Sequence, residues 1–578
     1  MKYIYHIFHM HSPDNTFHIQ SVAKIHPDFD SLEKKSSDDS FYNLFSIDKI
    51  QSYYPILELF FTEQENDLNN IALNHKYQFL TLDTVIETAT HTKHDKQVFI
   101  KCSPLINPTK YLIGNYKDDR TIFHLPSLNK DANSLSNQKM IDKNNISYID
   151  NFFSFLCSKL LHQHNFIHGI DYFGSFLGVQ HKFKTNICDD LDFLYGHPFF
   201  TENINKLYEV ENLPYQHFYS NSSRSNKTKL NLSNSPKHNI STSTLPELCI
   251  EEIDNTEPPS TPHIEDLKDD SEIIYENNNI HNVDEDTYDS DNSSDDSDVV
   301  NSDEEEEEDG EEEEDGNDSE YSSDESSDTS DENINAYIHN YPVQCICLEK
   351  CVSTFDDLLE NNLVTEENAS AFLMQIIMTL IVLQKTFHFT HNDLHTNNIM
   401  YIETSIEFIY YQYNNQTYKV PTYGKIFKLI DFGRGIYKFQ DHLFCSDSFA
   451  PGDDAATQYN FPPYYNKNKP IIEPNLSFDL CRLGCSIFDF IMETDTTELN
   501  EFQKIIARWC TDDYGKNVLY KKNGEERYPD FKLYKMIART VHEHLPENQL
   551  SYPYFSQFLS TTTSNPTVNI DSIPSYYT

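Results

Sequence analysis

Residues 391–398 combine an acid and an amide at a spacing that suits the handling of a phosphate group. Asp393 can accept a proton from an attacking hydroxyl, and Asn398, five residues later, can bind Mg²⁺ through its side-chain oxygen. Phosphoryl transfer needs little more from a protein than an aimed hydroxyl and metal-neutralised phosphate charge. Because Asp and Asn are also ordinary turn residues, this segment alone is only moderately specific.

A second motif, Asp431-Phe-Gly433, closes an apolar, β-prone run that starts at Lys428. A carboxylate at the end of a buried strand is costly unless it is paired or holds a metal ion, so Asp431 is predicted to bind the metal that bridges the phosphates. Upstream of both motifs, the β-prone run 98–101 ends in Lys101, which can neutralise phosphate oxygens. Taken alone, Lys101 is more simply a surface lysine, and its assignment depends on the other two motifs.

These side chains need strands and helices that bring distant parts of the chain together. The spacing of apolar residues predicts an amphipathic helix over 148–163 and a long apolar-faced helix over 365–387. A further buried helix is predicted over 478–492. Its first turn carries Asp479, with Gly484 five residues later.

In this order, the motifs resemble the eukaryotic-type protein kinase family. The divergent first part and the low-complexity insertion are similar to those of serine/threonine kinases of large nucleocytoplasmic DNA viruses. The resemblance covers roughly residues 75–218 and 337–550. It implies an α+β, two-lobe protein-kinase-like fold, with a small β-rich N-lobe, a helical C-lobe and ATP between them.

The resemblance implies a role for each of these residues. Asp393 would be the catalytic base, Lys101 would hold the α- and β-phosphates, and His395 stands where such kinases usually carry a lysine near the γ-phosphate. Asn398 and Asp431 would hold Mg²⁺ or Mn²⁺, the metal that accompanies ATP.

The resemblance also implies a site for the nucleotide base and a supporting frame. The adenine would lie against a hinge from Leu348 to Cys351. Asp150, the only acid in the helix over 148–163, would pair with Lys101 in place of the usual glutamate. The residues with structural roles would be Asp479, which braces the catalytic loop, His391 and Gly433.

Three departures from the family pattern bear on function. No glycine lies between Ile71 and Lys101, so the glycine-rich phosphate flap is missing, and the region 81–94 is expected to cover ATP poorly. Asn392 stands where many kinases carry an arginine that pairs with a phosphorylated activation loop, so that form of regulation is not expected. His395 would offer only part of a positive charge at neutral pH.

Composition marks the insertion, and the resemblance to protein kinases implies the other boundaries, so that the chain is divided into six segments. The insertion among them has too little apolar surface to offset the entropy of ordering, and an extra hairpin is predicted over 403–423. The segments are 1–72, an extension of unknown role; 73–218, the first part of the N-lobe; 219–336, a disordered Ser-rich and acidic insertion; 337–350, the last N-lobe strand and hinge; 351–555, the C-lobe; and 556–578, a tail.

A single tract carries most of the formal charge of −50. Between residues 251 and 340 there are 37 acidic residues and one basic residue, which leaves −14 for the rest of the chain. The tract is a solvated spacer, an arm that recruits basic proteins, or a target for phosphorylation. No basic patch of the kind that binds nucleic acid stands out.

Cysteine usage and hydropathy predict an intracellular, cytoplasmic protein without membrane contact. The eleven cysteines include no CxxC pair, and Cys345, Cys347 and Cys351 are interpreted as buried thiols rather than a metal site. The longest apolar run, 371–383, is too short and too polar to span a bilayer, and no secretory signal is visible. The oligomeric state does not follow from the sequence.

Three functions fit these motifs. The first is transfer of the γ-phosphate of ATP to protein Ser or Thr hydroxyls. The second is a kinase-like scaffold without catalysis, which the missing glycine flap and helix glutamate favour. The third is a small-molecule kinase of the aminoglycoside or choline type, whose loop often has a histidine at the position of His395. Asp431-Phe-Gly433 and the Asp479–Gly484 spacing argue against the third.

Overall fold

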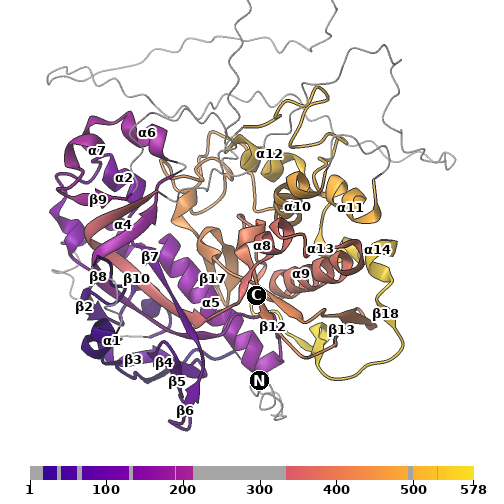
Figure 1. Ribbon diagram of the computed structural model, residues 1–578, viewed down its shortest axis with the longest axis horizontal. Coiled ribbons are helices and arrows are strands. Elements are labelled where there is room, and N and C mark those ends of the chain that lie inside the picture. Colours follow the sequence, from indigo (N-terminus) through magenta and orange to yellow (C-terminus); the bar gives the residue numbers. More distant parts are fainter. Residues whose placement is uncertain are drawn as a thin grey trace, which may run out of the picture. The chain divides into compact units, whose positions relative to one another are not determined.

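Five strands form an antiparallel sheet in the first half of the fold: β2 (Ile47–Gln51), β7 (Val98–Pro104), β8 (Tyr172–Asn186), β9 (Tyr208–Val210) and β10 (Asn335–Glu349). β10 pairs with both β7 and β8, β2 extends the sheet beyond β8, and β9 pairs with the start of β10 (Figure 1). A strand that follows the acidic tract in sequence therefore lies between strands that precede it. This pairing places the strand that ends at the predicted hinge beside the strand that carries Lys101.

The structure is a computed structural model that describes residues 17–35, 41–61, 68–128, 135–188, 190–211, 334–492, 499–529 and 531–577. All of them belong to one unit of the chain, residues 1–234 with 329–578. The predicted insertion, 219–336, lies outside the described residues apart from its last three. Of these, Asn335 and Ala336 already belong to β10, because Ala336 is buried opposite Val210.

Helix α5 (Ile146–His164) is buried along almost its whole length and confirms the helix predicted over 148–163. The side chain of Asn145 begins it by accepting the N–H of Ser147 at 3.0 Å. The ring of Phe153 stacks on Phe389, with centroids 4.2 Å apart. α5 thus joins the sheet to the second half of the chain. The shorter helices of the first half are α1 (Phe29–Lys35), α2 (Pro108–Leu112), α4 (Gln138–Ile141), α6 (Leu191–Tyr195) and α7 (Pro198–Asn203).

Helix α9 (Glu366–Phe387) lies at the centre of the helical second half (Figure 1). It confirms the predicted long helix, and α10 (Phe478–Ile491) confirms the helix predicted over 478–492. The amide of Gln375 binds the backbone of Lys425 and Phe427, each at 3.2 Å, and fixes α9 against a strand. The other helices here are α8 (Phe355–Glu360), α11 (Glu501–Trp509), α12 (Lys532–Thr540), α13 (Pro546–Gln549) and α14 (Pro553–Ser556).

Helix α9 contains the apolar run 371–383. By length and composition α9 is the one helix among the described residues that passes for a membrane span. However, 89% of its most apolar window is buried inside the fold. The apolar composition of α9 is therefore explained by its burial inside the protein.

The predicted hairpin over 403–423 is confirmed. Strands from the predicted tail and from the predicted N-terminal extension each pair within small sheets. β13 (Phe408–Tyr413) and β14 (Gln416–Pro421) pair with two strands from the predicted tail, β19 (Thr567–Asn569) and β18 (Leu559–Ser560). In the predicted extension, β1 (Ser21–Ala23) pairs with β3 (Ile71–Leu73). The remaining strands of the second half are β11 (Ser353–Thr354), β12 (Ile399–Glu403), β15 (Lys425–Leu429), β16 (Ile436–Phe439) and β17 (His442–Cys445).

The region 81–94 lies in a separate sheet of β4 (Tyr77–Thr81), β5 (Thr84–Glu87) and β6 (Lys93–Asp95). The ring of Tyr77 packs against His162 in the last turn of α5, with centroids 5.7 Å apart, and against Phe173. No hydrogen bond or ion pair between described residues joins this sheet to Lys101 or Asp431. Tyr77 thus anchors this sheet to the end of α5, and the expectation that the region 81–94 covers ATP poorly stays a prediction.

Candidate active site

Lys101 lies on β7 with its ammonium between two carboxylates. Its Nζ is 2.6 Å from Oδ2 of Asp150 and 2.8 Å from Oδ1 of Asp431. Burial by itself would lower the pKa of Lys101, but the two carboxylates outweigh this effect and raise the pKa above its ordinary value. Lys101 is therefore a fixed cation at neutral pH. The structure brings together three residues that the sequence placed in three separate segments.

Asp150, on α5, holds two parts of the chain at once. Its Oδ1 accepts the N–H of Phe432 at 2.9 Å while its Oδ2 receives Lys101. Burial raises the pKa of Asp150, against the lowering effect of Lys101. A side chain shorter than glutamate suffices here because α5 packs directly against the Asp431-Phe-Gly433 turn.

The turn after β15 presents the Asp431 carboxylate. Asp431 has a left-handed backbone, with φ 60° and ψ 66°, a region that Asp tolerates better than most non-glycine residues. Phe432 is buried, with its ring centroid 4.8 Å from that of Phe153. A Cβ on Gly433 would lie 2.9 Å from Cγ1 of Ile146, so this close packing suits glycine. The Asp431 side chain remains 47% exposed beside Lys101, which lowers its pKa although burial opposes the shift.

The loop 391–398 is held from below by Asp479 at the start of α10. Asp479 is fully buried, and its two oxygens accept the N–H groups of His391 and Asn392, each at 2.9 Å. Nε2 of His391 lies 2.9 Å from the carbonyl oxygen of Ile430. These contacts fix the loop to the strand that ends just before Asp431.

Asn398 is oriented by the loop itself. Its Nδ2 donates to the carbonyl oxygen of Asp393 at 2.9 Å and lies 3.1 Å from Nε2 of His395. Its Oδ1 has no hydrogen-bond donor among the described residues and is available to a cation. Because Nδ2 is a donor, Nε2 of His395 is the acceptor of that contact.

His395 does not carry the partial positive charge that the sequence suggested. Burial lowers the pKa of His395 to about 4, although Asp393 opposes the shift. The ring is therefore neutral at neutral pH. Its contact with Asn398 favours a positioning role over direct charge neutralisation.

Asp393 is engaged by side chains that sequence reasoning did not single out. The hydroxyl of Tyr534, on α12, donates to Oδ1 of Asp393 at 2.7 Å, and Nη1 of Arg434 lies 3.6 Å from Oδ2. Nε of Arg482 donates to the Tyr534 oxygen at 2.9 Å. Burial would raise the pKa of Asp393, but Arg434 and the other cations hold it well below its ordinary value. Tyr534 follows Asp393 by 141 residues, so no local pattern could reveal the contact.

The predicted hinge residues Leu348 and Cys351 are buried at the end of β10. Leu348 is the register partner of Phe99, which lies two residues before Lys101 and therefore shares its face of the sheet. The side chains of Phe99 and Val352 are 52% and 55% exposed. An apolar surface therefore adjoins the Lys101 site, and strand alternation alone could have pointed to Phe99.

The three clustered cysteines are buried thiols, as predicted. The Sγ atoms of Cys345 and Cys102 are 3.3 Å apart across β10 and β7. Within the part of the chain that the structure describes, no group of three or more His, Cys, Asp or Glu side chains has the arrangement of a metal site. A cation at this site would need ligands beyond those residue types, such as an amide oxygen and phosphate oxygens.

Comparisons with known proteins find a short match to protein kinases. The serine/threonine-protein kinase haspin of Mus musculus is 31% identical over 74 residues, which are 13% of this chain and 10% of that protein. The haspin of Bos taurus is 34% identical over 64 residues, 11% of this chain and 8% of that protein. The matched segment thus spans a tenth or less of these relatives, and no family model matches the chain. These matches support a protein-kinase-like relationship, while the similarity to viral kinases stays a prediction.

Proposed function

We propose that this protein is an ATP-dependent protein kinase that transfers the γ-phosphate of ATP to Ser or Thr hydroxyls. The observation that carries the proposal is the position of the Lys101 ammonium between Asp150 and Asp431, beside a braced loop that contains Asp393 and Asn398. Such a cluster supplies a fixed cation that can bind phosphates, and carboxylate and amide oxygens that can bind a metal ion. It also supplies a carboxylate that can accept the proton of the acceptor hydroxyl. The short similarity to haspin supports the same class.

Asp431 and Asn398 are the residues proposed to hold Mg²⁺ or Mn²⁺. The Asp431 carboxylate is half-exposed, and Oδ1 of Asn398 lacks a donor among the described residues, so both offer oxygen ligands of the kind that Mg²⁺ prefers. When bound, the cation would neutralise charge on the transferring phosphate. Lys101 would hold the remaining phosphate oxygens, and Asp393 would orient the acceptor hydroxyl and take its proton.

The nucleotide base is proposed to lie on the apolar surface of Phe99 and Leu348, next to the hinge at Cys351. An exposed aromatic ring gives a purine a stacking partner. Because no glycine-rich flap is present and the sheet over 77–95 packs against α5, we expect weaker ATP binding than a closed flap would give.

Basic proteins are the proposed substrates. The tract between residues 251 and 340, with 37 acidic residues and one basic residue, would raise their local concentration at the site. This tract lies outside the described residues, so the proposal rests on charge alone.

The test is transfer of radiolabel from γ-labelled ATP with Mg²⁺ or Mn²⁺ to casein, to myelin basic protein and to the chain itself. Wild type is compared with Asp393→Ala, Asp431→Asn and an exposed control, Asp118→Asn. We expect label from wild type and the control, with a loss of at least about 100-fold in both site variants. Phosphoamino-acid analysis then identifies the acceptor hydroxyl. Transfer that survives both site substitutions would sink the proposal.

A second candidate is a kinase-like scaffold that binds ATP without transferring phosphate. The contact of Tyr534 with Asp393 favours it, because a protein hydroxyl already occupies the proposed base. Under this alternative, ATP binds and depends on Lys101, but no acceptor is labelled. Transfer to choline or an aminoglycoside, with none to protein, would instead indicate a small-molecule kinase.

A further inference from the structure

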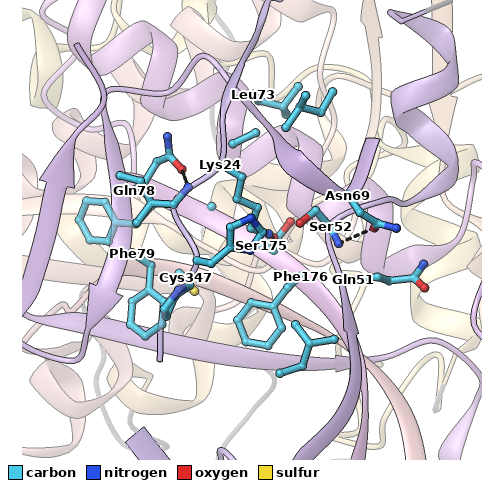
Figure 2. Close-up of a pocket in the computed structure, with 18 of the residues that line it drawn as sticks. Lys24, Gln51, Ser52, Asn69, Leu73, Gln78, Phe79, Ser175, Phe176 and Cys347 are labelled. Carbon is cyan, nitrogen blue, oxygen red and sulfur yellow. Dashed lines mark hydrogen bonds between the residues drawn. The ribbon is translucent and has the colours of Figure 1, made fainter. Parts of the chain in front are cut away.

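A cavity of about 210 Å³ lies on the opposite face of the first sheet from Lys101 (Figure 2). Cys347 lines it, whereas its neighbours Ile346 and Leu348 share the face of Lys101. Its other walls come from β3, β4 and β8 and from the segments that follow β1 and β2. The cavity is therefore separate from the candidate active site and is enclosed by the N-terminal segment that had no assigned role.

Lys24 is a poorly compensated cation in this cavity. In Figure 2 its side chain runs toward Ser175, and its Nζ donates to the carbonyl oxygen of Ser175 at 3.2 Å, its one hydrogen bond among the described residues. An ammonium group has three N–H donors. The described residues that line the cavity include no Asp or Glu. Lys24 is partly buried, and a cation that is partly withdrawn from water without a counter-ion is costly, so the cavity favours a negative charge.

A second polar side chain at the same cavity lacks hydrogen-bond partners. Both ring nitrogens of His75 are buried without a hydrogen bond to any described residue, and the residue is 3% exposed. Buried polar groups are rarely left unpaired in proteins. The His75 ring and the Lys24 ammonium, on one cavity, therefore point to a bound molecule that supplies acceptors.

We propose that this cavity binds a small organic monocarboxylate, with its carboxylate on Lys24 and its apolar body against the aromatic wall. A single lysine balances one negative charge, and a phosphate dianion would bring a second charge without a partner. His75 would donate to the carboxylate or to a second polar atom of the ligand. The apolar wall includes Phe29, Leu57, Phe79, Phe173 and Phe176.

Isothermal titration of the full chain with phenylacetate and its neutral isostere phenylacetamide tests the proposal. We expect phenylacetate to bind with a Kd below about 1 mM, since a ligand of this size can gain about 0.3–1.5 kcal/mol per non-hydrogen atom. Phenylacetamide should bind at least about tenfold more weakly, and Lys24→Met should weaken phenylacetate by at least about tenfold. Inorganic phosphate should show no binding that depends on Lys24.

Two matched variants separate this site from others. Lys35→Met changes an exposed lysine of the same N-terminal segment, and Lys101→Met changes the lysine of the candidate active site. Both should leave the phenylacetate affinity unchanged, and near-ultraviolet circular dichroism checks that each variant is folded. Equal binding of acid and amide, unchanged affinity in Lys24→Met, or no binding of phenylacetate overturns the proposal. A failure at this cavity leaves the phosphotransfer proposal untouched.

The pH dependence gives an independent readout. Burial lowers the pKa of Lys24 to about 8, so the free protein loses its cation as pH rises through that value. The other titratable groups that line the cavity are Cys347, His75, His26, Tyr54 and Tyr172, and burial raises the pKa of both tyrosines well above its ordinary value. Burial raises the pKa of Cys347 well above its ordinary value and lowers that of His75 to about 3, so neither titrates between pH 6 and pH 9. Phenylacetate affinity should stay level to about pH 8 and then fall about tenfold per pH unit. An affinity that is level to pH 10 contradicts the role of Lys24.

Discussion

Asp150 makes two interactions that depend on its negative charge to different degrees. Asp150→Asn keeps an oxygen for the N–H of Phe432 but removes the charge from beside Lys101. We expect kcat/KM for phosphate transfer to fall about 10- to 100-fold, or about 1.4–2.7 kcal/mol of transition-state stabilisation. Steady-state kinetics with ATP varied would measure it.

The exposed Asp118→Asn serves as the matched control, because it removes the same charge from a residue outside the site. Its kcat/KM should equal that of wild type. Full activity in Asp150→Asn would show that Lys101 needs no partner on α5.

If Asp393 is the base proposed above, the Tyr534 hydroxyl would compete with the acceptor hydroxyl for it. Tyr534→Phe removes the hydrogen bond to Oδ1 of Asp393 and one contact of Arg482. Because that hydrogen bond lowers the pKa of Asp393, its loss should make the carboxylate more basic and more accessible. We expect kcat/KM for the protein acceptor to rise about 3- to 10-fold. This increase corresponds to no more free energy than one hydrogen bond to a charged group contributes. Initial rates over a range of acceptor concentrations measure this.

Tyr514→Phe, which changes a highly exposed tyrosine, should have no effect on those rates. A drop in kcat with Tyr534→Phe, in place of a rise, would mean that the phenol positions Asp393 for catalysis.

At the scale of elements, α10 supports the catalytic loop through one side chain. Asp479→Ala leaves the N–H groups of His391 and Asn392 buried without acceptors. Each unsatisfied donor costs about 1–3 kcal/mol, so the loss of two acceptors should lower the free energy of unfolding by about 2–6 kcal/mol. Urea denaturation followed by circular dichroism measures the change.

Glu501 is also an acid in the first turn of a helix, but its side chain is exposed. Glu501→Ala should therefore cost no more than about 1 kcal/mol. Equal losses in the two variants would refute a bracing role for Asp479.

At the scale of the whole molecule, the ends of the long insertion lie side by side. Val210 is the register partner of Ala336, and the N–H of Glu211 donates to the carbonyl oxygen of Asn335 at 2.9 Å. A short Gly/Ser loop can therefore join β9 to β10. Replacing residues 213–332 should leave the unfolding midpoint within about 2 °C of wild type, since β9 and β10 keep their pairing.

The same replacement tests the acidic arm. If the tract recruits basic proteins, KM for myelin basic protein should rise about threefold or more at low salt while KM for ATP is unchanged. In a second chain of native length, the Asp and Glu of 303–315 become Asn and Gln. This chain should reproduce the effect, and a normal KM in both chains would end the recruitment proposal.

Local sequence determined the elements whose signal is short-range. Periodicity and turn residues predicted four elements, and the structure confirms each. These are the helices over 148–163, 365–387 and 478–492 and the hairpin over 403–423. The spacing within 391–398 also fixes the contact between Asn398 and Asp393, because both lie on one turn.

Tertiary structure alone decided the contacts that no motif or resemblance named. The family resemblance predicted the pair of Asp150 and Lys101, and the packing of α5 against two separated segments accounts for it. The contact of Tyr534 with Asp393, across 141 residues, had no sign in the sequence. The segment around Tyr77 carried no sign of its packing on α5. Local sequence patterns predict the secondary structure of a segment. The partner of a buried charge instead depends on how whole helices and strands pack together. For that reason the sequence named most of the candidate site, and only the fold placed Tyr534 on Asp393 and Lys24 in its cavity.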